Sequence, residues 1–207
     1  MLAGASVDEN GDRGWVIVSR ATRDGHSLVL NTICSSGNVR FLFPETLMSK
    51  PFVAILMGSD SDKPVMEAAA DVLTALGVTS EMRITSAHRT PADTVEFVRD
   101  AEKRGCQVFI AGAGMAAHLA GAVSAQTLKP VIGVPLDAGT LGGMDALLST
   151  VQMPGGIPVA SVAIGKAGAK NAGYLAAQII GTSDPDLHQR LIDERAANAE
   201  AIRQKNA

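Results

Sequence analysis

The fold is decided by Phe52-Val-Ala-Ile-Leu-Met57, which is followed by Gly58-Ser-Asp-Ser-Asp62 and by a segment of helical periodicity, Lys63–Leu76. An unbroken apolar run of this length is typical of a strand that is buried on both faces of a parallel sheet. Four later runs are also predicted to be strands, the first of them weakly: Met82–Thr85, Cys106–Ala111, Pro130–Val134 and Val159–Ile164.

Segments with helical periodicity lie between and after these strands. They are Pro91–Arg104, Met115–Thr127, Gly142–Val151, Ala167–Ile180 and Pro185–Gln204. This alternation predicts an α/β fold in which helices cover both faces of a doubly wound parallel sheet of about five strands, with an additional C-terminal helix. Because crossovers are right-handed, the strand order 2-1-3-4-5, called flavodoxin-like, is favoured.

Capping residues mark the expected helix ends. Asp62 is expected to cap the first helix, and Pro91 is expected to open the second helix directly after Thr90. Gly77 and Gly105 occupy positions where C-terminal caps belong.

The sequence changes character near Met48. Upstream of it, Gly, Asp, Asn and Ser irregularly separate three short candidate strands, Trp15–Ser19, Ser27–Leu30 and Val39–Phe43. We therefore divide the chain into an N-terminal extension, residues 1–47, and a main domain, residues 48–207. Three interpretations of the extension are open: a small β appendage, a disordered segment, or sequence that precedes the natural start of the protein. We slightly favour the last.

The composition indicates one main domain and argues against two classes of partner. Of the 207 residues, 46% are hydrophobic and 19% are charged, which allows a sizeable core. Lys and Arg number 18 against 21 Asp and Glu, so the net charge of −3 gives no reason to bind nucleic acid. Neither a membrane span nor a leader peptide is evident, so we expect a cytoplasmic protein without a membrane partner.

Cysteine, histidine and alanine patterns bear on metals and assembly. Cys34 and Cys106 lie far apart, and the four histidines lack partners at ligand spacing, so we predict neither a disulfide scaffold nor a metal site. The Ala-rich segment Met115–Ala125 has almost no charged face. Burial between subunits explains such a helix most simply, so we expect a homo-oligomer.

Three loops with unusual residues follow strands one to three, at the sheet edge where ligands bind in this class of fold. In the first, Gly58–Asp62, the hydroxyls of Ser59 and Ser61 lie beside helix N-terminal N–H groups, which suits an anion. Asp62 could instead accept hydrogen bonds from sugar hydroxyls. The alternative that this loop only caps a helix stays equally open.

The second loop is Thr85-Ser-Ala-His-Arg-Thr-Pro91. The forked guanidinium of Arg89 can bind a phosphate. Histidine is the side chain best suited to donate and accept a proton near neutral pH, so His88 is a candidate acid–base residue. In the alternative interpretation, His88 bonds only to the backbone and Arg89 pairs with a surface acid.

The third loop combines Ala111-Gly-Ala-Gly114 with Met115-Ala-Ala-His118. Its small residues let a ligand touch the backbone, and the following helix is expected to present its N-terminal N–H groups there. We predict a dry pocket for a small anion or CO2. His118 is expected to be a packed histidine.

The motifs of the three loops, in this order, closely resemble the PurE family. The residues that carry the resemblance are Gly58-Ser-Asp-Ser-Asp62, Ser86-Ala-His-Arg-Thr-Pro91, Ala111-Gly-Ala-Gly114, Ala116-Ala-His-Leu119, Gly133-Val-Pro135, Val151-Gln-Met-Pro-Gly-Gly-Ile-Pro158 and Ala163-Ile-Gly-Lys-Ala167. The resemblance covers about residues 52–195 and implies an enzyme of de novo purine synthesis. The family's bacterial type is a mutase that converts N5-carboxyaminoimidazole ribonucleotide (N5-CAIR) to its C4-carboxylated isomer (CAIR). The animal type carboxylates aminoimidazole ribonucleotide (AIR) with CO2 directly and typically has Ala-His-Lys-Gly-Pro, so Ala87-His-Arg-Thr-Pro91 favours the mutase.

The resemblance implies a role for each matching residue. The implied catalytic residue is His88, and the implied substrate-binding residues are Ser59, Ser61, Asp62, Ser86, Arg89, Ala113 and Gly114. Asp62 would contact ribose hydroxyls, while Ser86 and Arg89 would hold the phosphate. Met115 and Ala120 depart from the family's frequent Gly and Pro and flank the pocket.

The resemblance further implies a small-molecule substrate, no metal and no ATP or other cofactor, a homo-octamer, and functional coupling to N5-CAIR synthetase. Three alternatives remain: a direct AIR carboxylase, a related carboxylase of a pyridinium dinucleotide, and a non-catalytic flavodoxin-like binding module. Flavin binding is disfavoured because the loops contain no aromatic residue to stack on the ring.

Overall fold

Five parallel strands form the sheet that positions the candidate site. In a computed structural model of the chain, which describes residues 2–7, 13–23, 26–35, 38–42 and 51–206, these strands are β5 (Phe52–Met57), β6 (Thr79–Ile84), β7 (Cys106–Gly114), β8 (Val131–Leu136) and β9 (Ala160–Ser161). They lie in the order β6-β5-β7-β8-β9 and every adjacent pair is parallel. The predicted α/β class and the order 2-1-3-4-5 are therefore confirmed.

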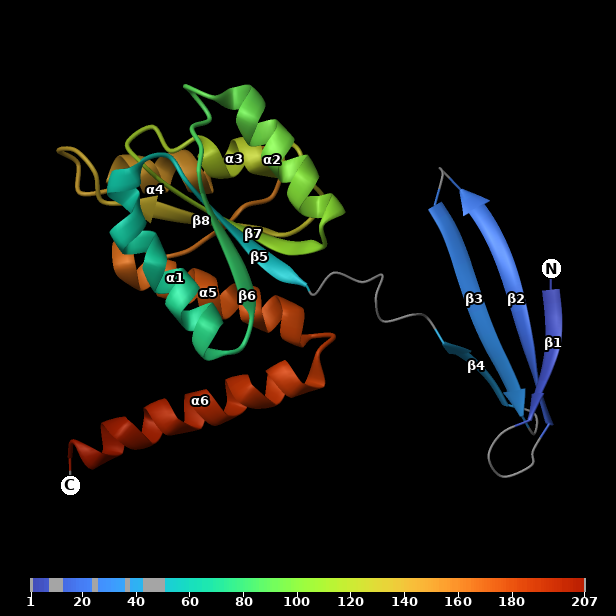
Figure 1. Cartoon of the computed structure of the whole chain (residues 1–207). Helices are drawn as coiled ribbons and strands as arrows, with labels where there is room; N and C mark the ends of the chain where they lie inside the picture. Colours follow the sequence, from blue (N-terminus) through green and yellow to red (C-terminus); the bar gives the residue numbers. More distant parts are fainter. Residues whose placement is uncertain (1, 8–12, 24–25, 36–37, 43–50, 207) are drawn as a thin grey trace. The chain divides into compact units, whose positions relative to one another are not determined.

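Helices cover both faces of this sheet (Figure 1). They are α1 (Lys63–Ala75), α2 (Pro91–Lys103), α3 (Leu119–Ser124), α4 (Met144–Val151), α5 (Gly165–Gly181) and α6 (Pro185–Gln204), and a short 3-10 turn, η2 (Asp60–Asp62), precedes α1. Helices α1 and α5 pack on one face, and α2 and α3 pack on the other.

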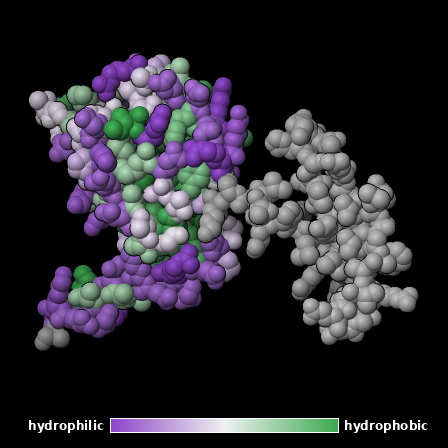
Figure 2. Space-filling model, viewed as in Figure 1, coloured by the Kyte–Doolittle hydropathy of each residue, from purple (hydrophilic) through white to green (hydrophobic). Residues whose placement is uncertain are grey.

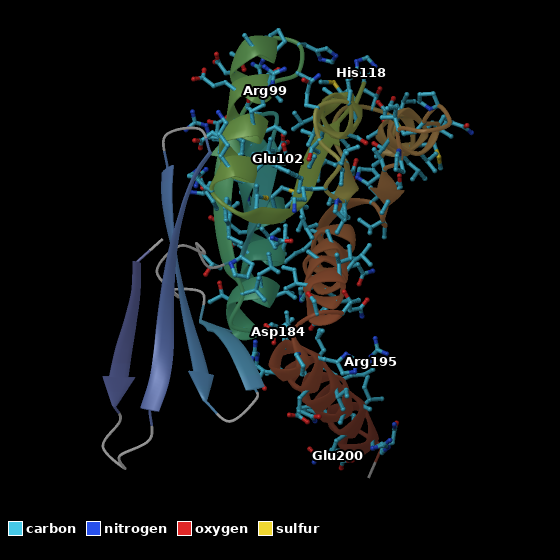
Figure 3. All side chains as sticks on the ribbon, turned by 90° about the vertical axis from the view of Figure 1, so that its right-hand side faces the viewer. Arg99, Glu102, His118, Asp184, Arg195 and Glu200 are labelled. Carbon is cyan, nitrogen blue, oxygen red and sulfur yellow. The ribbon has the colours of Figure 1, made fainter. Side chains whose placement is uncertain are left out.

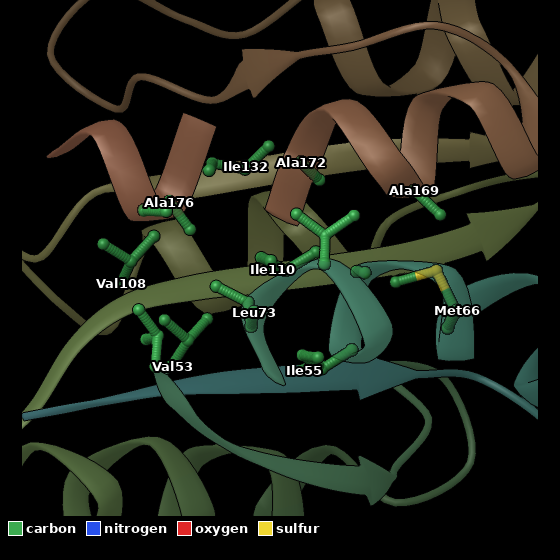
Figure 4. Close-up of a cluster of buried hydrophobic side chains, with 14 of the residues drawn as sticks. Val53, Ile55, Met66, Leu73, Val108, Ile110, Ile132, Ala169, Ala172 and Ala176 are labelled. Atoms are coloured by element: carbon green, nitrogen blue, oxygen red, sulfur yellow. The ribbon is translucent and has the colours of Figure 1, made fainter. Parts of the chain in front are cut away.

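Both faces of β5 are buried, which explains its unbroken apolar sequence. Val53, Ile55 and Met57 face the core beneath α1 and α5. Figure 4 shows Val53 and Ile55 in this core together with Leu73 and Ile110. The alternate residues of the same strand face the core beneath α2 and α3. Each fully buried aliphatic side chain of this kind stabilises the fold by about 1.5–3 kcal/mol relative to exposure.

Small residues allow α5 to approach its neighbours closely. A Cβ atom at Gly173 would lie 2.8 Å from the carbonyl oxygen of Ala69 in α1. A Cβ atom at Gly168 would overlap the carbonyl oxygen of Ala163, so only glycine fits at the start of this helix. The alanine and glycine content of α5 is thus explained by packing within this unit.

The last helix, α6, is bound mainly through its first turns. Asp184 caps it by accepting a hydrogen bond from the Leu187 amide at 2.9 Å, and Leu187 is its one buried residue. In the view of Figure 2, the parallel-sheet unit is mostly hydrophilic and α6 is hydrophilic along most of its length. The predicted range of this helix, Pro185–Gln204, is confirmed.

The expected helix over Met115–Thr127 is wrong at both ends. Strand β7 continues to Gly114, and α3 occupies only Leu119–Ser124. The interruption lies at Met115, whose φ of 52° makes it the one non-glycine residue with positive φ among the residues that the structure describes. A helix cannot pass through a left-handed residue, so the chain turns before α3 begins. In the single chain Met115 is 59% exposed, and the expected burial of this segment between subunits stays a prediction.

Other expected boundaries differ less. Strand β6 begins earlier than expected and ends at Ile84, and β9 is limited to Ala160–Ser161. Pro91 opens α2 as predicted, and the positive φ of Gly77 and Gly105 confirms that they end the helices before them.

The N-terminal part of the chain forms a separate unit, residues 1–48. Its backbone makes a four-stranded antiparallel sheet of β1 (Leu2–Val7), β2 (Arg13–Arg23), β3 (His26–Ser35) and β4 (Asn38–Leu42), in chain order. The candidate strands at Trp15–Ser19 and Ser27–Leu30 lie within β2 and β3. The expectation that the natural chain starts near Met48 stays a prediction.

Among the residues that the structure describes, no helix is both long and apolar enough to cross a membrane.

Candidate active site

The three predicted loops meet at the carboxyl edge of the sheet. We call residues 58–62 loop 1, residues 85–90 loop 2 and residues 113–118 loop 3. The Thr85 amide donates to the Met57 carbonyl at 2.8 Å, which joins the starts of loops 1 and 2. His88 of loop 2 contacts His118 of loop 3, so the loops converge as predicted.

Loop 1 contains the turn η2, and its serine hydroxyls form hydrogen bonds within the loop. The Ser61 hydroxyl donates to Ser59 Oγ at 2.9 Å, and the Ser59 hydroxyl donates to the Asp60 carboxylate at 3.0 Å. Ser59 Oγ also accepts from the Ser61 amide at 3.3 Å, so Ser59 caps this turn. Both serines therefore present polar atoms at the edge of the site.

The expectation that Asp62 caps α1 is wrong. Asp62 occupies the N-cap position with helical backbone angles and makes no side-chain capping hydrogen bond. Its carboxylate lies over loop 1 instead, near the backbone N–H groups of Gly58 and Ser59. Partial burial, with a smaller effect of the nearby Asp60, raises the pKa of the Asp62 carboxyl above its usual value of 3.8, although those two N–H groups and the nearby Arg89 lower it.

This raised pKa predicts a pH-dependent gain in stability for Asp62→Asn. The folded protein binds the Asp62 proton more tightly than the unfolded chain does. Protonation of Asp62 therefore contributes fully to the stability of the fold below the unfolded pKa of 3.8. This contribution is lost as the pH rises through the raised folded pKa. We therefore expect urea unfolding to show that Asp62→Asn raises the free energy of unfolding, relative to wild type, by more at about pH 7 than at about pH 4.

The exposed Asp71→Asn on α1 is the matched control for this series. A difference between Asp62→Asn and wild type that shrinks as the pH rises would contradict the assignment.

Loop 2 is a tight turn that holds His88 and Arg89. The Thr90 amide closes it by donating to the Ser86 carbonyl at 2.8 Å. Ser86 Oγ accepts from the Arg89 amide at 3.1 Å and from Arg89 Nε at 3.4 Å. Arg89 Nη2 donates to the Gly58 carbonyl at 2.7 Å, which fixes the guanidinium between loops 1 and 2. Within the described residues, Arg89 is therefore bound to the loops instead of to a surface acid.

Loop 3 brings a second imidazole to the first. Nε2 of His88 lies 2.6 Å from Nδ1 of His118, and the two rings meet edge to face with centroids 4.7 Å apart. One ring nitrogen must carry the proton and the other must accept it, so the pair shares a hydrogen bond. Both side chains are exposed in the single chain. Figure 3 shows His118 at the end of the unit opposite α6.

The expectation that His118 is a packed histidine is wrong, and the sequence analysis missed this member of the site. Its side chain lies at the surface and contacts His88, which is 30 residues away in the chain. The signal that could have found it is position, because His118 follows β7 at the same sheet edge where His88 follows β6.

Ala113 and Gly114 form the last residues of β7, where they pair with Pro135 and Leu136 of β8. Both are half-buried. A Cβ atom at Gly114 would lie 2.5 Å from the Ala138 Cβ, so a larger residue does not fit. Since α3 starts only at Leu119, its N-terminal N–H groups are not adjacent to Gly114, contrary to expectation.

The two departures from the family pattern lie in different surroundings. Met115 lies near Gly139, which is on the loop after β8. A Cβ atom added at Gly139 would lie 3.5 Å from Met115 Cγ. Ala120 is buried in the core beneath α3. Neither change removes a polar group from the three loops.

Among the described side chains, no three of the types His, Cys, Asp and Glu gather as metal ligands would. Burial raises the pKa of the Cys106 thiol to about 11, which keeps it protonated at neutral pH. The side chain of Cys34 lies outside the described residues.

The three loops together offer a defined set of groups. The guanidinium of Arg89 and the nearby hydroxyls suit an anion such as phosphate. The carboxylate of Asp62 can accept hydrogen bonds from sugar hydroxyls. The imidazole pair can hold and return one proton. This combination suits a sugar phosphate that undergoes proton transfer.

Proteins of known function have similar sequences over most of this chain. Residues 52–201 match the family described as AIR carboxylase. The chain is 53% identical over 150 residues to the N5-carboxyaminoimidazole ribonucleotide mutase of Escherichia coli (strain K12), covering 72% of this chain and 89% of that protein. It is 55% identical over 149 residues to the enzyme of the same name from Bacillus subtilis (strain 168), covering 72% of this chain and 91% of that protein.

A solved structure supports the same assignment. The crystal structure of Treponema denticola PurE superposes with a TM-score of 0.68 at 32% identity, covering 75% of this chain and 96% of that chain. Since the family match spans well over half of the sequence and the quoted motifs fill the three loops, the chain belongs to the AIR carboxylase family.

Proposed function

We propose that this protein is an N5-carboxyaminoimidazole ribonucleotide mutase, which converts N5-CAIR to CAIR in purine biosynthesis, and that His88 carries the proton. The observation that carries the proposal is the imidazole pair at 2.6 Å beside the anchored Arg89. It is supported by the identity of 53% and 55% to two mutases over 150 and 149 residues. The pair supplies a proton donor and acceptor, and Arg89 supplies a fixed cation for the phosphate.

The substrate binds across all three loops in this proposal. Asp62 accepts hydrogen bonds from the ribose hydroxyls, with Ser59 beside it. The phosphate lies against Arg89 and the hydroxyls of Ser86 and Ser61. The position of Arg89 supports this, because its guanidinium is already held between loops 1 and 2. A cation fixed before binding loses less entropy when the phosphate arrives.

The reaction then needs one proton and no other reagent. Protonated His88 gives its proton to N5 as the bond from N5 to the carboxyl carbon breaks, which yields CO2 and AIR. CO2 stays against the small residues Ala113 and Gly114 until C4 of AIR attacks its carbon. Neutral His88 finally removes the C4 proton, which restores aromaticity and yields CAIR with His88 protonated again.

His118 supports this cycle by position. Its hydrogen bond to His88 Nε2 orients the imidazole and lets positive charge be shared between the two rings. A positioned acid–base group accelerates reactions by about 10²–10⁴-fold. Retaining CO2 beside its acceptor adds an effective-concentration gain.

The decisive test is conversion of N5-CAIR to CAIR by the purified full chain without ATP and without added bicarbonate. We expect product under these conditions. Product that forms from AIR only when bicarbonate is added would indicate a direct AIR carboxylase instead. Carboxylation of a pyridinium dinucleotide in a parallel reaction would favour the third alternative, and nucleotide binding without turnover would indicate a binding module.

Assembly, partners and location are further parts of the proposal. A homo-octamer is supported by the large apolar side chains that the single chain leaves exposed, among them Met115, Leu141, Met144 and Leu148. Because the carbamate of N5-CAIR must be formed by another enzyme, N5-CAIR synthetase is the expected functional partner. We expect the protein to act in the cytoplasm, where this pathway operates.

A further inference from the structure

We propose that Thr85 and Thr94 are positioning residues, which hold the His88 loop in its reactive geometry through a chain of buried hydroxyl groups. This inference rests on the proposed function and extends it to two residues that contact neither the substrate nor the reacting atoms. Thr85 directly follows β6 as the first residue of loop 2, and Thr94 lies in the first turns of α2, just after the loop ends.

The two hydroxyls meet in the protein interior. Thr85 is 5% exposed and Thr94 is 2% exposed, and their Oγ1 atoms lie 2.7 Å apart. Around them, loop 2 packs through Ala87 against the apolar core that includes Phe97 and Val98 of α2. A hydroxyl pair in such surroundings is favourable only while both members stay hydrogen-bonded, so its geometry is strongly specified.

From this pair, hydrogen bonds reach both ends of loop 2. Thr94 Oγ1 donates to the Thr90 carbonyl at 3.1 Å, which leaves it to accept from the Thr85 hydroxyl. Thr90 Oγ1 accepts from the Ser86 amide at 3.1 Å, and its one hydroxyl hydrogen is shared between the Ser86 carbonyl at 3.3 Å and Thr85 Oγ1 at 3.4 Å. The chain of hydroxyls thus fixes Ser86 and Thr90, between which His88 and Arg89 lie.

The same geometry separates the two functions of the loop. Arg89 has an anchor outside loop 2, because its guanidinium donates to the Gly58 carbonyl of loop 1. The His88 side chain bonds to His118, which is itself an exposed side chain on another loop and not a fixed backbone group. Losing the threonine anchor should therefore disturb proton transfer by His88 more than phosphate binding by Arg89.

Three variants test the anchor in the full-length protein, with kcat, KM and thermal unfolding measured for each. We expect Thr94→Val to lower kcat about tenfold while KM for N5-CAIR changes less than about twofold, because a small misplacement of an acid–base group is costly. Thr94→Ser restores the hydroxyl and should restore kcat. Thr150→Val is the matched control, since Thr150 is also buried and bonds to the Ala146 carbonyl within α4.

The double variant Thr85→Val/Thr94→Val separates positioning from stability. Replacing both buried partners with apolar groups of similar shape leaves no unpaired hydroxyl between them, so thermal stability should recover relative to Thr94→Val. Positioning predicts that kcat stays low in spite of that recovery. A merely structural role predicts that kcat recovers with stability, and that result would overturn the proposal, as would a native kcat in Thr94→Val.

Amide hydrogen exchange tests the threonine anchor without a measurement of enzyme activity. In Thr94→Val we expect the Ser86 and Thr90 amides to exchange faster, while the amides of β5 keep the wild-type rate. If wild type itself makes no CAIR, the proposed mutase function fails, and the exchange rates still decide whether the anchor exists. Unchanged exchange at both amides would refute the anchor.

Discussion

His88→Asn lowers kcat for the conversion of N5-CAIR to CAIR by about 10²–10⁴-fold, while the affinity for CAIR stays within a few fold of wild type. Asparagine keeps a polar amide of similar reach, but it cannot carry a proton between N5 and C4. Binding should survive because Arg89 is held by Ser86 and Gly58, and not by His88. Stopped assays for kcat and calorimetry for CAIR binding measure the two effects separately.

His188→Asn is the matched control for that experiment. His188 is exposed on α6 and belongs to none of the three loops, so its replacement should leave kcat unchanged. Normal turnover in His88→Asn would remove His88 from the mechanism. A loss of CAIR binding equal to the loss of kcat would instead make His88 a binding residue.

Arg89→Met weakens CAIR binding by about 10- to 100-fold, since charge-assisted hydrogen bonds contribute about 1.5–3 kcal/mol. Methionine has similar length but neither charge nor donors, so the phosphate loses its partner. The exposed Arg99→Met on α2, labelled in Figure 3, is the matched control and should bind CAIR normally.

The dephosphorylated nucleoside of CAIR identifies which part of the ligand Arg89 binds. Wild type and Arg89→Met should bind this nucleoside equally weakly, because the group that Arg89 contacts is missing from it. Calorimetric titration of both proteins with both ligands gives the coupling between Arg89 and the phosphate. An equal loss for nucleotide and nucleoside would show that Arg89 acts on loop geometry and does not contact the phosphate.

The placement of the loops could be predicted because strand burial and helix periodicity are local properties of the sequence. β5 is apolar on both faces, which requires helices on both sides and therefore a parallel sheet. In such a sheet the loops after β5, β6 and β7 must share one edge. The sequence therefore predicts that His88, Arg89 and Asp62 lie near one another.

The contacts inside the site could not be predicted in the same way. His118 was expected to be packed, because the helix was expected to start at Met115 and to bury its side chain. The left-handed backbone of Met115 delays the helix to Leu119 and leaves His118 beside His88. Whether one residue adopts that conformation depends on packing against the loop after β8, which periodicity does not report.

The sequence alone determined the sheet order, the helices that cover it and the family, because these depend on apolar patterns and motifs that are read along the chain. Only the tertiary structure decided which polar groups bond to one another: His88 with His118, Arg89 with Gly58, and Thr85 with Thr94. Hydrogen bonds form and weaken within a few tenths of an ångström, so they follow from the final packing of loops that lie far apart in the sequence.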